Sequence, residues 1–201
     1  MRIAIVHFHL QTGGVTRVIQ HACETLASAG HSVLVLTGEA PPQALGLSAK
    51  VAVLAGLGYQ ERCAQQTPDE LAAALVDTAR EQLGSVPDVW HVHNHCLGKN
   101  LILPGALMRL VRGGHRLLLQ PHDFAEDGRP ALYRRLRDRL ADGDVGRLSA
   151  SLYPLAPQIH YAVLNERDQS FLAAAGVPRA NLHLLANAGS ESAPVSEPEI
   201  E

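Results

Sequence analysis

Aromatic residues are scarce in this sequence, at 4% of its 201 residues. Proteins that stack nucleic-acid bases depend on aromatic side chains. The formal net charge of −3 is also the wrong sign for a general nucleic-acid binder. No stretch approaches the ~20 apolar residues of a membrane span. The N-terminus has no long apolar core and no small-residue cleavage site, so it is not a secretory signal. These absences exclude nucleic acid as an expected partner and predict neither a membrane span nor a secretory signal.

Cysteine is rare as well, with only Cys23, Cys63 and Cys96. An odd, scattered set of this kind is typical of free thiols in a reducing compartment. We therefore expect a cytoplasmic protein. Familiar catalytic motifs are missing too, because the sequence contains no Gly-x-Ser-x-Gly elbow and no cysteine with an obvious positive partner.

What the sequence does contain is a regular alternation of strand-like and helix-like segments. Hydrophobic residues make up 46% of the chain, which is enough for a sizeable core. Apolar runs predict strands at 2–8, 32–37, 50–54, 88–93, 115–120, 159–164 and 181–185, and helical spacing predicts helices near 15–26, 68–83, 103–112, 129–141 and 166–175. This order predicts an α/β fold: a doubly wound, mainly parallel Rossmann-like sheet of about seven strands with helices on both faces. We expect one domain over residues 1–186 and a disordered linker or tail over 187–201.

The first loop is the strongest candidate for a binding site. It follows a buried strand, ends at a helix and contains Gly13 and Gly14. Loops in this position lie at the carboxyl end of the sheet, where open α/β folds bind ligands. Glycine lets backbone N–H groups approach an anion closely, and the helix N-terminus adds unpaired donors. Arg17 would add a formal charge. A tight turn with no ligand is the alternative, since the loop lacks both G-x-G-x-x-G and the P-loop pattern.

Two further loops, 93–99 and 121–127, fall at carboxyl ends of predicted strands. His122 and Asp123 follow a buried strand and a proline. His122 there could hydrogen-bond a sugar hydroxyl or accept a proton, whereas the alternative is a loop-capping pair in which Asp123 binds local backbone. His93, at the end of its strand, is a candidate ligand contact.

Alternating histidines raise the question of a metal site. His91, His93 and His95 would point to one face of a strand, and neutral imidazoles bind Zn²⁺. However, His91 lies inside an apolar strand, where a hydrogen-bonded core histidine is expected, and His95 falls past the strand end. The sequence offers no clear thiolate or carboxylate set beside them, so we predict no metal.

Arginines gather on the predicted helix 129–141, at positions 134, 135, 137 and 139. Leucines recur there every four residues, so the helix is amphipathic with a basic face. Such a face usually faces solvent. The alternative is peripheral contact with anionic lipid at the inner face of the membrane, or with a phosphorylated acceptor.

Four segments together resemble the N-terminal domain of glycosyltransferase family 4, which has the GT-B fold. IAIVHFHLQTGGVTRVIQHACETLASAGHSVLVLT is similar to the family's first strand, Gly-Gly loop and first helix. PDVWHVHNH resembles a mid-domain strand with a terminal histidine, and LLLQPHDF resembles the strand before a His-Asp loop. YAVLNERDQSFLAAAGVPRANLHLLANA is similar to the closing segment. The order and spacing of the four segments carry the resemblance.

This resemblance implies retaining transfer of a sugar from a nucleotide-sugar donor to a hydroxyl acceptor on a sugar, lipid or other molecule, with no required metal or other cofactor. It implies that Gly13 and Gly14 lie near the donor diphosphate and the acceptor. It makes His122 the catalytic residue, in contact with the donor sugar, and puts His93 and Asn94 on the acceptor side. The leaving diphosphate gains negative charge, which fixed N–H donors would stabilise. Arg17 and Asp123 remain binding candidates by their loops.

The resemblance also implies a donor-binding C-terminal domain, whose paired glutamates and basic residues are absent here. We therefore expect little or no turnover by this chain alone, and completion by a C-terminal domain in the same protein or by a second chain. Ala186–Gly189 (ANAG) replaces the family's Pro-Asn-Gly-Val, and Asn165 replaces a serine, although Asn also caps helices.

Two other hypotheses stay open. One is a non-catalytic binding module of the same fold, and the other is a metal-dependent hydrolase built on the histidines.

Overall fold

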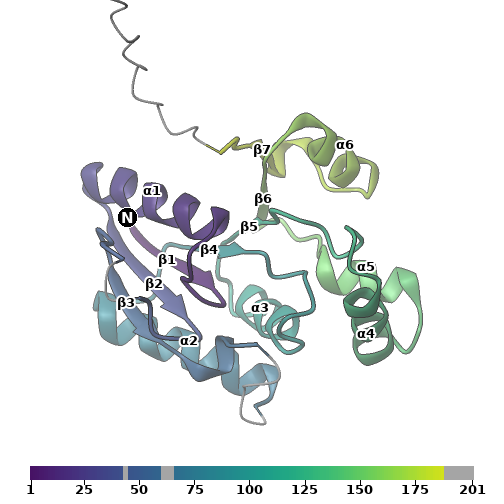
Figure 1. Ribbon diagram of the computed structural model, residues 1–201, viewed down its shortest axis with the longest axis horizontal. Coiled ribbons are helices and arrows are strands. Elements are labelled where there is room, and N and C mark those ends of the chain that lie inside the picture. Colours follow the sequence, from purple (N-terminus) through teal and green to yellow (C-terminus); the bar gives the residue numbers. More distant parts are fainter. Residues whose placement is uncertain (43–44, 60–65, 188–201) are drawn as a thin grey trace, which may run out of the picture.

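The computed structural model shows a seven-stranded sheet with helices on both sides (Figure 1). The structure describes residues 1–42, 45–59 and 66–187. The strands pair in the order β3-β2-β1-β4-β5-β6-β7, and every pairing is parallel. The predicted doubly wound α/β fold is therefore confirmed. Cys63 and the predicted tail, apart from Asn187, lie outside the described residues.

Each strand is short, and the five inner strands are largely buried, whereas the two edge strands are half-buried or exposed over most of their length. The strands are β1 (Arg2–His7), β2 (Ser32–Thr37), β3 (Lys50–Val53), β4 (Val89–His93), β5 (Leu117–Gln120), β6 (Ile159–Val163) and β7 (Leu182–Leu184). Continuous apolar runs suit central parallel strands, because helices cover both of their faces. β1 lies beside β2 and β4, at the point where the strand order changes direction. Open α/β sheets bind ligands at that point.

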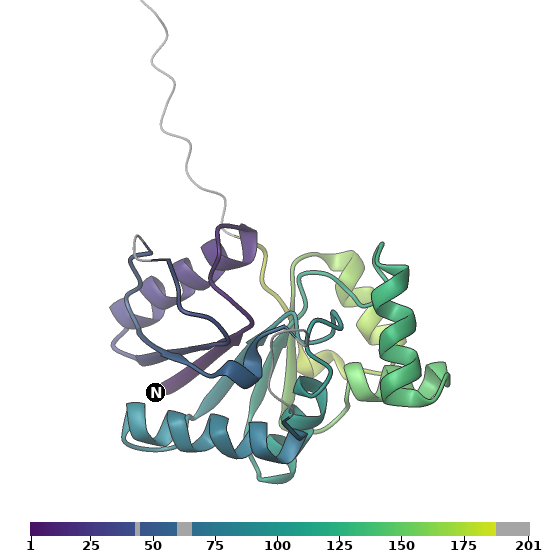
Figure 2. The ribbon, with the colours of Figure 1, turned by 60° about the horizontal axis from the view of Figure 1, so that its bottom comes forward.

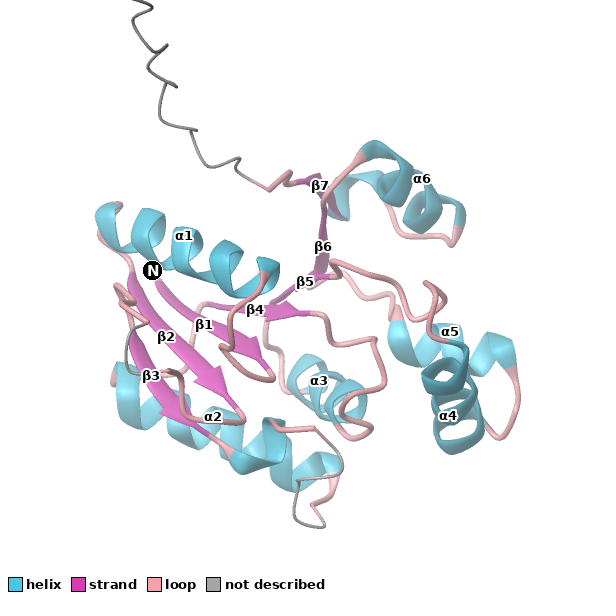
Figure 3. Cartoon of the chain, viewed as in Figure 1, coloured by secondary structure: helices cyan, strands magenta, loops and turns pink. Residues whose placement is uncertain are grey.

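In the part of the chain that the structure describes, six helices connect the strands (Figure 3). They are α1 (Gly14–Ser28), α2 (Pro68–Leu83), α3 (Leu103–Arg112), α4 (Pro130–Ala141), α5 (Val145–Leu152) and α6 (Glu166–Ala174), with short 3₁₀ turns η1 (Ala55–Leu57) and η2 (Arg179–Asn181). The sequence did not predict α5. This helix has only eight residues, and it begins where Asp144 accepts a hydrogen bond from the backbone of Arg147. A segment so short has too few turns for its periodicity to stand out.

Local capping explains where several helices begin and end. Thr67 and Glu70 form a reciprocal capping box at the start of α2. Asn165 accepts a hydrogen bond from the backbone N–H of Asp168 at the start of α6, as expected for a capping asparagine. Gly30 and Gly84 end α1 and α2 with φ values of 77° and 74°, a conformation that costs glycine little.

The two faces of the sheet are covered unequally (Figure 2). α2, α3, α4, α5 and α6 contribute to the larger core, on one face. Among the described helices, α1 alone packs against the smaller core on the other face, where it buries Ile19 and Cys23 against β1 and β2. The sheet on this second face is therefore covered over β1 and β2 but lacks a described helix over β5 to β7.

α4 has the amphipathic character that its sequence predicts. Leu136 is buried beneath the helix, while Arg134 and Arg139 are exposed. Contact of this basic face with lipid stays a prediction. Among the helices of the described chain, none has the length and apolar character needed to span a membrane. Cys23 and Cys96 are free thiols, as predicted, and both are buried.

Candidate functional site

The candidate site lies at the carboxyl ends of three adjacent strands. β4 pairs with β1 on one side and with β5 on the other, so the loops that follow these strands meet. Together with Tyr59, they enclose a pocket of about 310 Å³, here called the rim pocket. Of the predicted site residues, Gly13, Gly14, Asn94 and Asp123 line it. The expected convergence of the three loops is therefore what the structure shows.

Gly13 and Gly14 lie at the entrance to α1 with open space beside them. A Cβ atom at Gly13 would approach only the carbonyl oxygen of Gln11, at 3.9 Å, and one at Gly14 would meet nothing within 4 Å. Gly13 has an extended backbone, with φ 169° and ψ 170°, which any residue can adopt. Gly14 is not among the residues with positive φ. Neither the turn nor the packing therefore requires glycine at these positions.

Among the described residues, nothing caps the backbone donors in the first turn of α1. The N–H groups at a helix start have no partner within the helix, and Gly13 supplies no side-chain cap. The nearby hydroxyl of Thr16 donates to the carbonyl oxygen of Gln11, 2.5 Å away, so it does not cap these groups. This end of α1 therefore offers N–H donors and a partial positive charge to the rim pocket.

Asn94 connects the two polar loops. Its Oδ1 accepts a hydrogen bond from the backbone N–H of His122 at 2.7 Å, and the N–H of Asp123 lies 3.4 Å away. Its own backbone N–H donates to Gln120 at 3.0 Å. Asn94 has a φ of 53°, a left-handed conformation that asparagine tolerates better than most residues. The chain therefore turns at Asn94, and the strand alternation ends there.

Four imidazoles cluster beneath the rim. Nδ1 of His93 lies 2.9 Å from Nε2 of His122, and the two rings are stacked. The ring of His91 lies 4.3 Å from that of His93, and Nδ1 of His7 donates to the carbonyl oxygen of His93. Burial lowers the pKa of His7 and of His91 to about 4. Burial also holds the pKa of His93 well below its usual value and lowers that of His122. The cluster is therefore uncharged at neutral pH.

The alternating histidines of β4 do not act as a set. His91 is a buried, hydrogen-bonded residue as predicted, with Nε2 2.7 Å from Oε1 of Gln120. His95 lies beyond the strand end, as predicted, and its Nε2 donates to the carbonyl oxygen of Leu152 at 2.7 Å. Within the described ranges, no three His, Cys, Asp or Glu side chains are arranged to hold a metal ion. The geometry gives the metal-dependent hydrolase hypothesis no support.

Several residues that the sequence analysis did not single out also shape the rim pocket. Lys99 places its ammonium group 4.9 Å from the centre of the Tyr59 ring, and the Tyr59 hydroxyl lies 2.7 Å from Nε2 of His9. Arg129 pairs with Asp123 at 3.1 Å. Lys99 closes the loop 93–99, so its place at a strand's carboxyl end was a usable signal. Tyr59 carried no signal, because its segment has no clear periodicity.

The other predicted residues lie around the rim pocket but do not line it. Arg17 is exposed and borders a neighbouring hollow of about 290 Å³ that shares Gly13 with the rim pocket. His93 is fully buried beneath the rim, and His122 is partly buried between His93 and the loop. A direct ligand contact is open to Arg17 and His122, whereas His93 is too deeply buried for one. The assigned roles of these three residues stay predictions.

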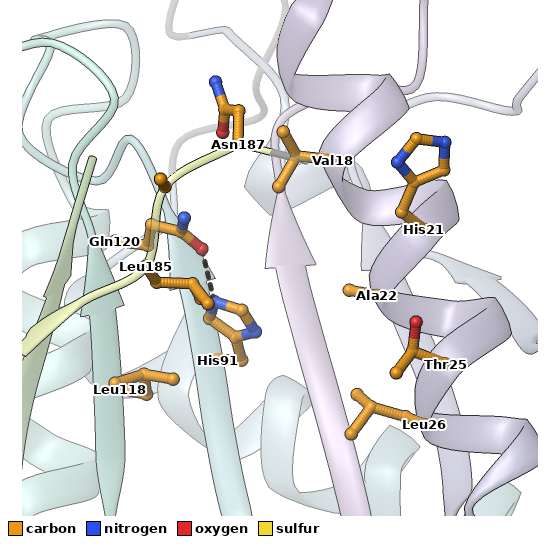
Figure 4. A pocket seen from close by; sticks show the side chains of 11 residues that line it. Val18, His21, Ala22, Thr25, Leu26, His91, Leu118, Gln120, Leu185 and Asn187 are labelled. Carbon is orange, nitrogen blue, oxygen red and sulfur yellow. Dashed lines mark hydrogen bonds between the residues drawn. The ribbon is translucent and has the colours of Figure 1, made fainter. Parts of the chain in front are cut away.

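A separate apolar groove of about 330 Å³ lies on the sparsely covered face, between α1 and the chain after β7 (Figure 4). Val18, Ala22 and Leu26 of α1 form one wall, and Leu185 faces them from the other side. The hydrogen-bonded pair of His91 and Gln120 lies at its floor. A parallel sheet is normally covered on both faces, so this groove is an apolar surface without a described cover.

Comparison with known proteins supports the family that the four sequence segments resemble. The family model described as "Glycosyl transferase 4-like domain" matches residues 13–188. A curated protein from Petrotoga mobilis, mannosylglucosyl-3-phosphoglycerate synthase, is 26% identical over 198 residues. That alignment covers 92% of this chain but 36% of the relative, so the chain spans about a third of the relative's length.

A solved structure was also found, with a looser likeness. The crystal structure of a UDP-galactose 4-epimerase shares 13% identity, covers 93% of this chain and 87% of its own chain, and has a TM-score of 0.35. At that TM-score the two folds are too different for the likeness to bear on function.

Proposed function

The chain belongs to the glycosyl transferase 4-like domain family, and from that premise we propose that it is the acceptor-side domain of a retaining glycosyltransferase. The donor would be a nucleotide sugar, and the transfer would need no bound metal. The complete transferase would include a donor-binding part beyond this chain, since the chain spans about a third of its curated relative.

One observation carries this proposal: two adjacent glycines border the rim pocket although neither turn geometry nor packing requires them. Small residues in open space leave room for something outside the chain. Unpaired N–H groups at the start of α1 suit an anion such as a diphosphate. As a sugar leaves its diphosphate, negative charge grows on the phosphate oxygens, and donors fixed in advance stabilise that charge.

We further propose that the acceptor is itself anionic. Lys99 and the start of α1 give the rim pocket positive character, while Asp123 is paired with Arg129. The relative's name includes 3-phosphoglycerate, a group that carries both a phosphate and a carboxylate.

The apolar groove between α1 and Leu185 is the proposed docking face for the donor-binding part, supplied in the same protein or by a second chain.

Binding to the ¹⁵N-labelled 201-residue chain tests the proposal. We expect 3-phosphoglycerate to shift the amide resonances of Gly13 to Thr16 and of Lys99, and uncharged glucose to shift them far less. Equal shifts with both probes would contradict an anionic acceptor.

Incubation with UDP-, GDP- and ADP-sugars should give no detectable transfer by this chain alone. Measurable transfer would overturn the requirement for a donor-binding part.

A further inference from the structure

The contact between His93 and His122 imposes a choice of proton position. Their facing nitrogens, Nδ1 of His93 and Nε2 of His122, lie 2.9 Å apart. Burial lowers the pKa of both rings, so each is neutral and carries one ring proton at neutral pH. A hydrogen bond at this distance needs one nitrogen to donate and the other to accept. Two arrangements satisfy this condition.

In the first arrangement, Nδ1–H of His93 donates to Nε2 of His122. His122 then carries its own proton on Nδ1, and Nε2 of His93 is bare. In the second arrangement, Nε2–H of His122 donates to Nδ1 of His93. His93 then carries its proton on Nε2, and His122 presents a bare Nδ1.

Burial of His93 favours the first arrangement. The side chain is fully buried, and its Nε2 has no hydrogen-bond partner in the described part of the chain. The second arrangement would place an N–H donor there with nothing to accept it. Orphaned buried N–H groups are rare in native proteins, and under-used acceptors are tolerated more often.

His95 shows that this protein tolerates a buried imidazole nitrogen that carries no proton and has no hydrogen-bond partner. Its Nε2 lies 2.7 Å from the carbonyl oxygen of Leu152, which can only accept, so Nε2 carries the proton. Nδ1 of His95 is therefore bare, and it is buried without a partner among the described residues. A bare, buried imidazole nitrogen thus already exists two residues along the chain from His93.

We propose that His93 is a positioning residue that holds His122 in the Nδ1–H tautomer, so that the rim meets its ligand with an N–H donor rather than a lone pair. Within the described ranges, Nδ1 of His122 makes no hydrogen bond and is not one of the buried polar atoms that lack a partner, so it is accessible. Of the two roles open to His122, donation to a ligand oxygen is then the one available, and proton abstraction through Nδ1 is not. This consequence rests on the proposed function, whereas the tautomer does not.

Imidazole ¹⁵N NMR of the ligand-free, ¹⁵N-histidine-labelled chain at pH 7.5 tests the proposal directly. We expect His122 to show a protonated Nδ1 and a bare Nε2. A protonated Nε2 on His122 would overturn the proposal. His160 and His183 provide an internal comparison, because their nitrogens also lie 2.8 Å apart but in an exposed position. Without a buried nitrogen to decide between tautomers, that pair should show averaged signals.

Two variants test whether His93 is the cause. His93→Asn can place an amide N–H where Nδ1 stood, so His122 should keep its Nδ1–H tautomer. His93→Leu removes the donor, and His122 should shift toward a mixture of tautomers. An unchanged His122 signal in a folded His93→Leu chain would rule out the positioning role. The wild-type spectrum decides the tautomer even if neither variant folds. No ligand is present, so failure of the proposed function would leave this result intact.

Discussion

Oδ1 of Asn94 lies 2.7 Å from the backbone nitrogen of His122, and this hydrogen bond joins the end of β4 to the loop after β5. The two residues are 28 positions apart in the chain. Because Asn94 also lines the rim pocket, one side chain both shapes the pocket and fixes the backbone that carries His122. The position of His122 therefore depends on a neighbouring strand as well as on its own loop.

Replacement of Asn94 by glycine should loosen the loop after β5. Glycine adopts the φ of 53° without strain, so the change removes the side-chain hydrogen bonds of Asn94 without straining the backbone. We expect the free energy of unfolding to fall by about 1–2 kcal/mol. Amide exchange at His122 should become faster. Asn94→Asp keeps an acceptor oxygen at the same place and should preserve slow exchange. Unchanged protection of His122 in Asn94→Gly would contradict the connecting role of Asn94.

Gly14→Ala should separate ligand binding from folding. A Cβ atom at this position meets nothing within 4 Å, so the domain should accept it. Alanine at the first position of a helix should raise the free energy of unfolding by up to about 1 kcal/mol. The same methyl group would occupy the space beside the anion-binding N–H groups, so the 3-phosphoglycerate shifts should weaken at least several-fold. Gly46→Ala, which also meets nothing within 4 Å, is the control. Equal binding of 3-phosphoglycerate by both variants would show that Gly14 does not belong to the anion-binding site.

Gly38→Ala should destabilise the protein strongly. A Cβ atom there would lie 2.2 Å from the backbone nitrogen of Gly58, and backbone cannot move aside as a flexible side chain can. We expect a loss of about 3 kcal/mol or more in the free energy of unfolding. Urea denaturation of Gly38→Ala beside Gly46→Ala measures this difference. Similar midpoints for the two variants would mean that the loop after β2 can shift away from η1.

Acid should destabilise the fold through its buried histidines. Burial lowers the pKa of His7, His91 and His95 from 6.5 to about 4. Between these two values the unfolded chain binds more protons than the folded one. The free energy of unfolding should therefore fall as the pH drops through this window, by about 1.4 kcal/mol per pH unit for each such histidine. Denaturation midpoints at pH 7.5, 6.0 and 5.0 measure the slope.

His95→Gln isolates one member of this group. The glutamine amide can donate to Leu152 from the place of Nε2 but does not titrate. The slope of stability against pH should become shallower by the contribution of one histidine, about 1.4 kcal/mol per pH unit. An unchanged slope would show that His95 does not cause the acid sensitivity.

Local pattern was sufficient to predict much of this fold. Apolar runs such as Ser32–Thr37 predict strands whether or not their partners are known. Capping residues such as Thr67, and Gly84 with its φ of 74°, mark helix ends through contacts with nearby residues in the chain. Such signals are readable because the interactions that produce them are local. α5 was missed, since eight residues complete too few turns to reveal a period.

The candidate site was only partly predictable. The three loops could be identified, because strand alternation places their ends on one side of a parallel sheet. The sequence could not show that His93 is buried against His122, nor that Lys99 and Tyr59 border the same pocket as Gly13. Those contacts join residues far apart in the chain.

The α/β class, the order of most elements and the three candidate loops could all be predicted from local sequence, because hydrophobic period, caps and glycines act over a few residues. The different hydrogen-bond partners of the histidines, by contrast, depend on the tertiary fold. His91 is held by Gln120, His95 by Leu152 and His93 by His122. These three residues look alike in the sequence. They differ in the structure because strand register and the turn at Asn94 give each imidazole a different distant partner.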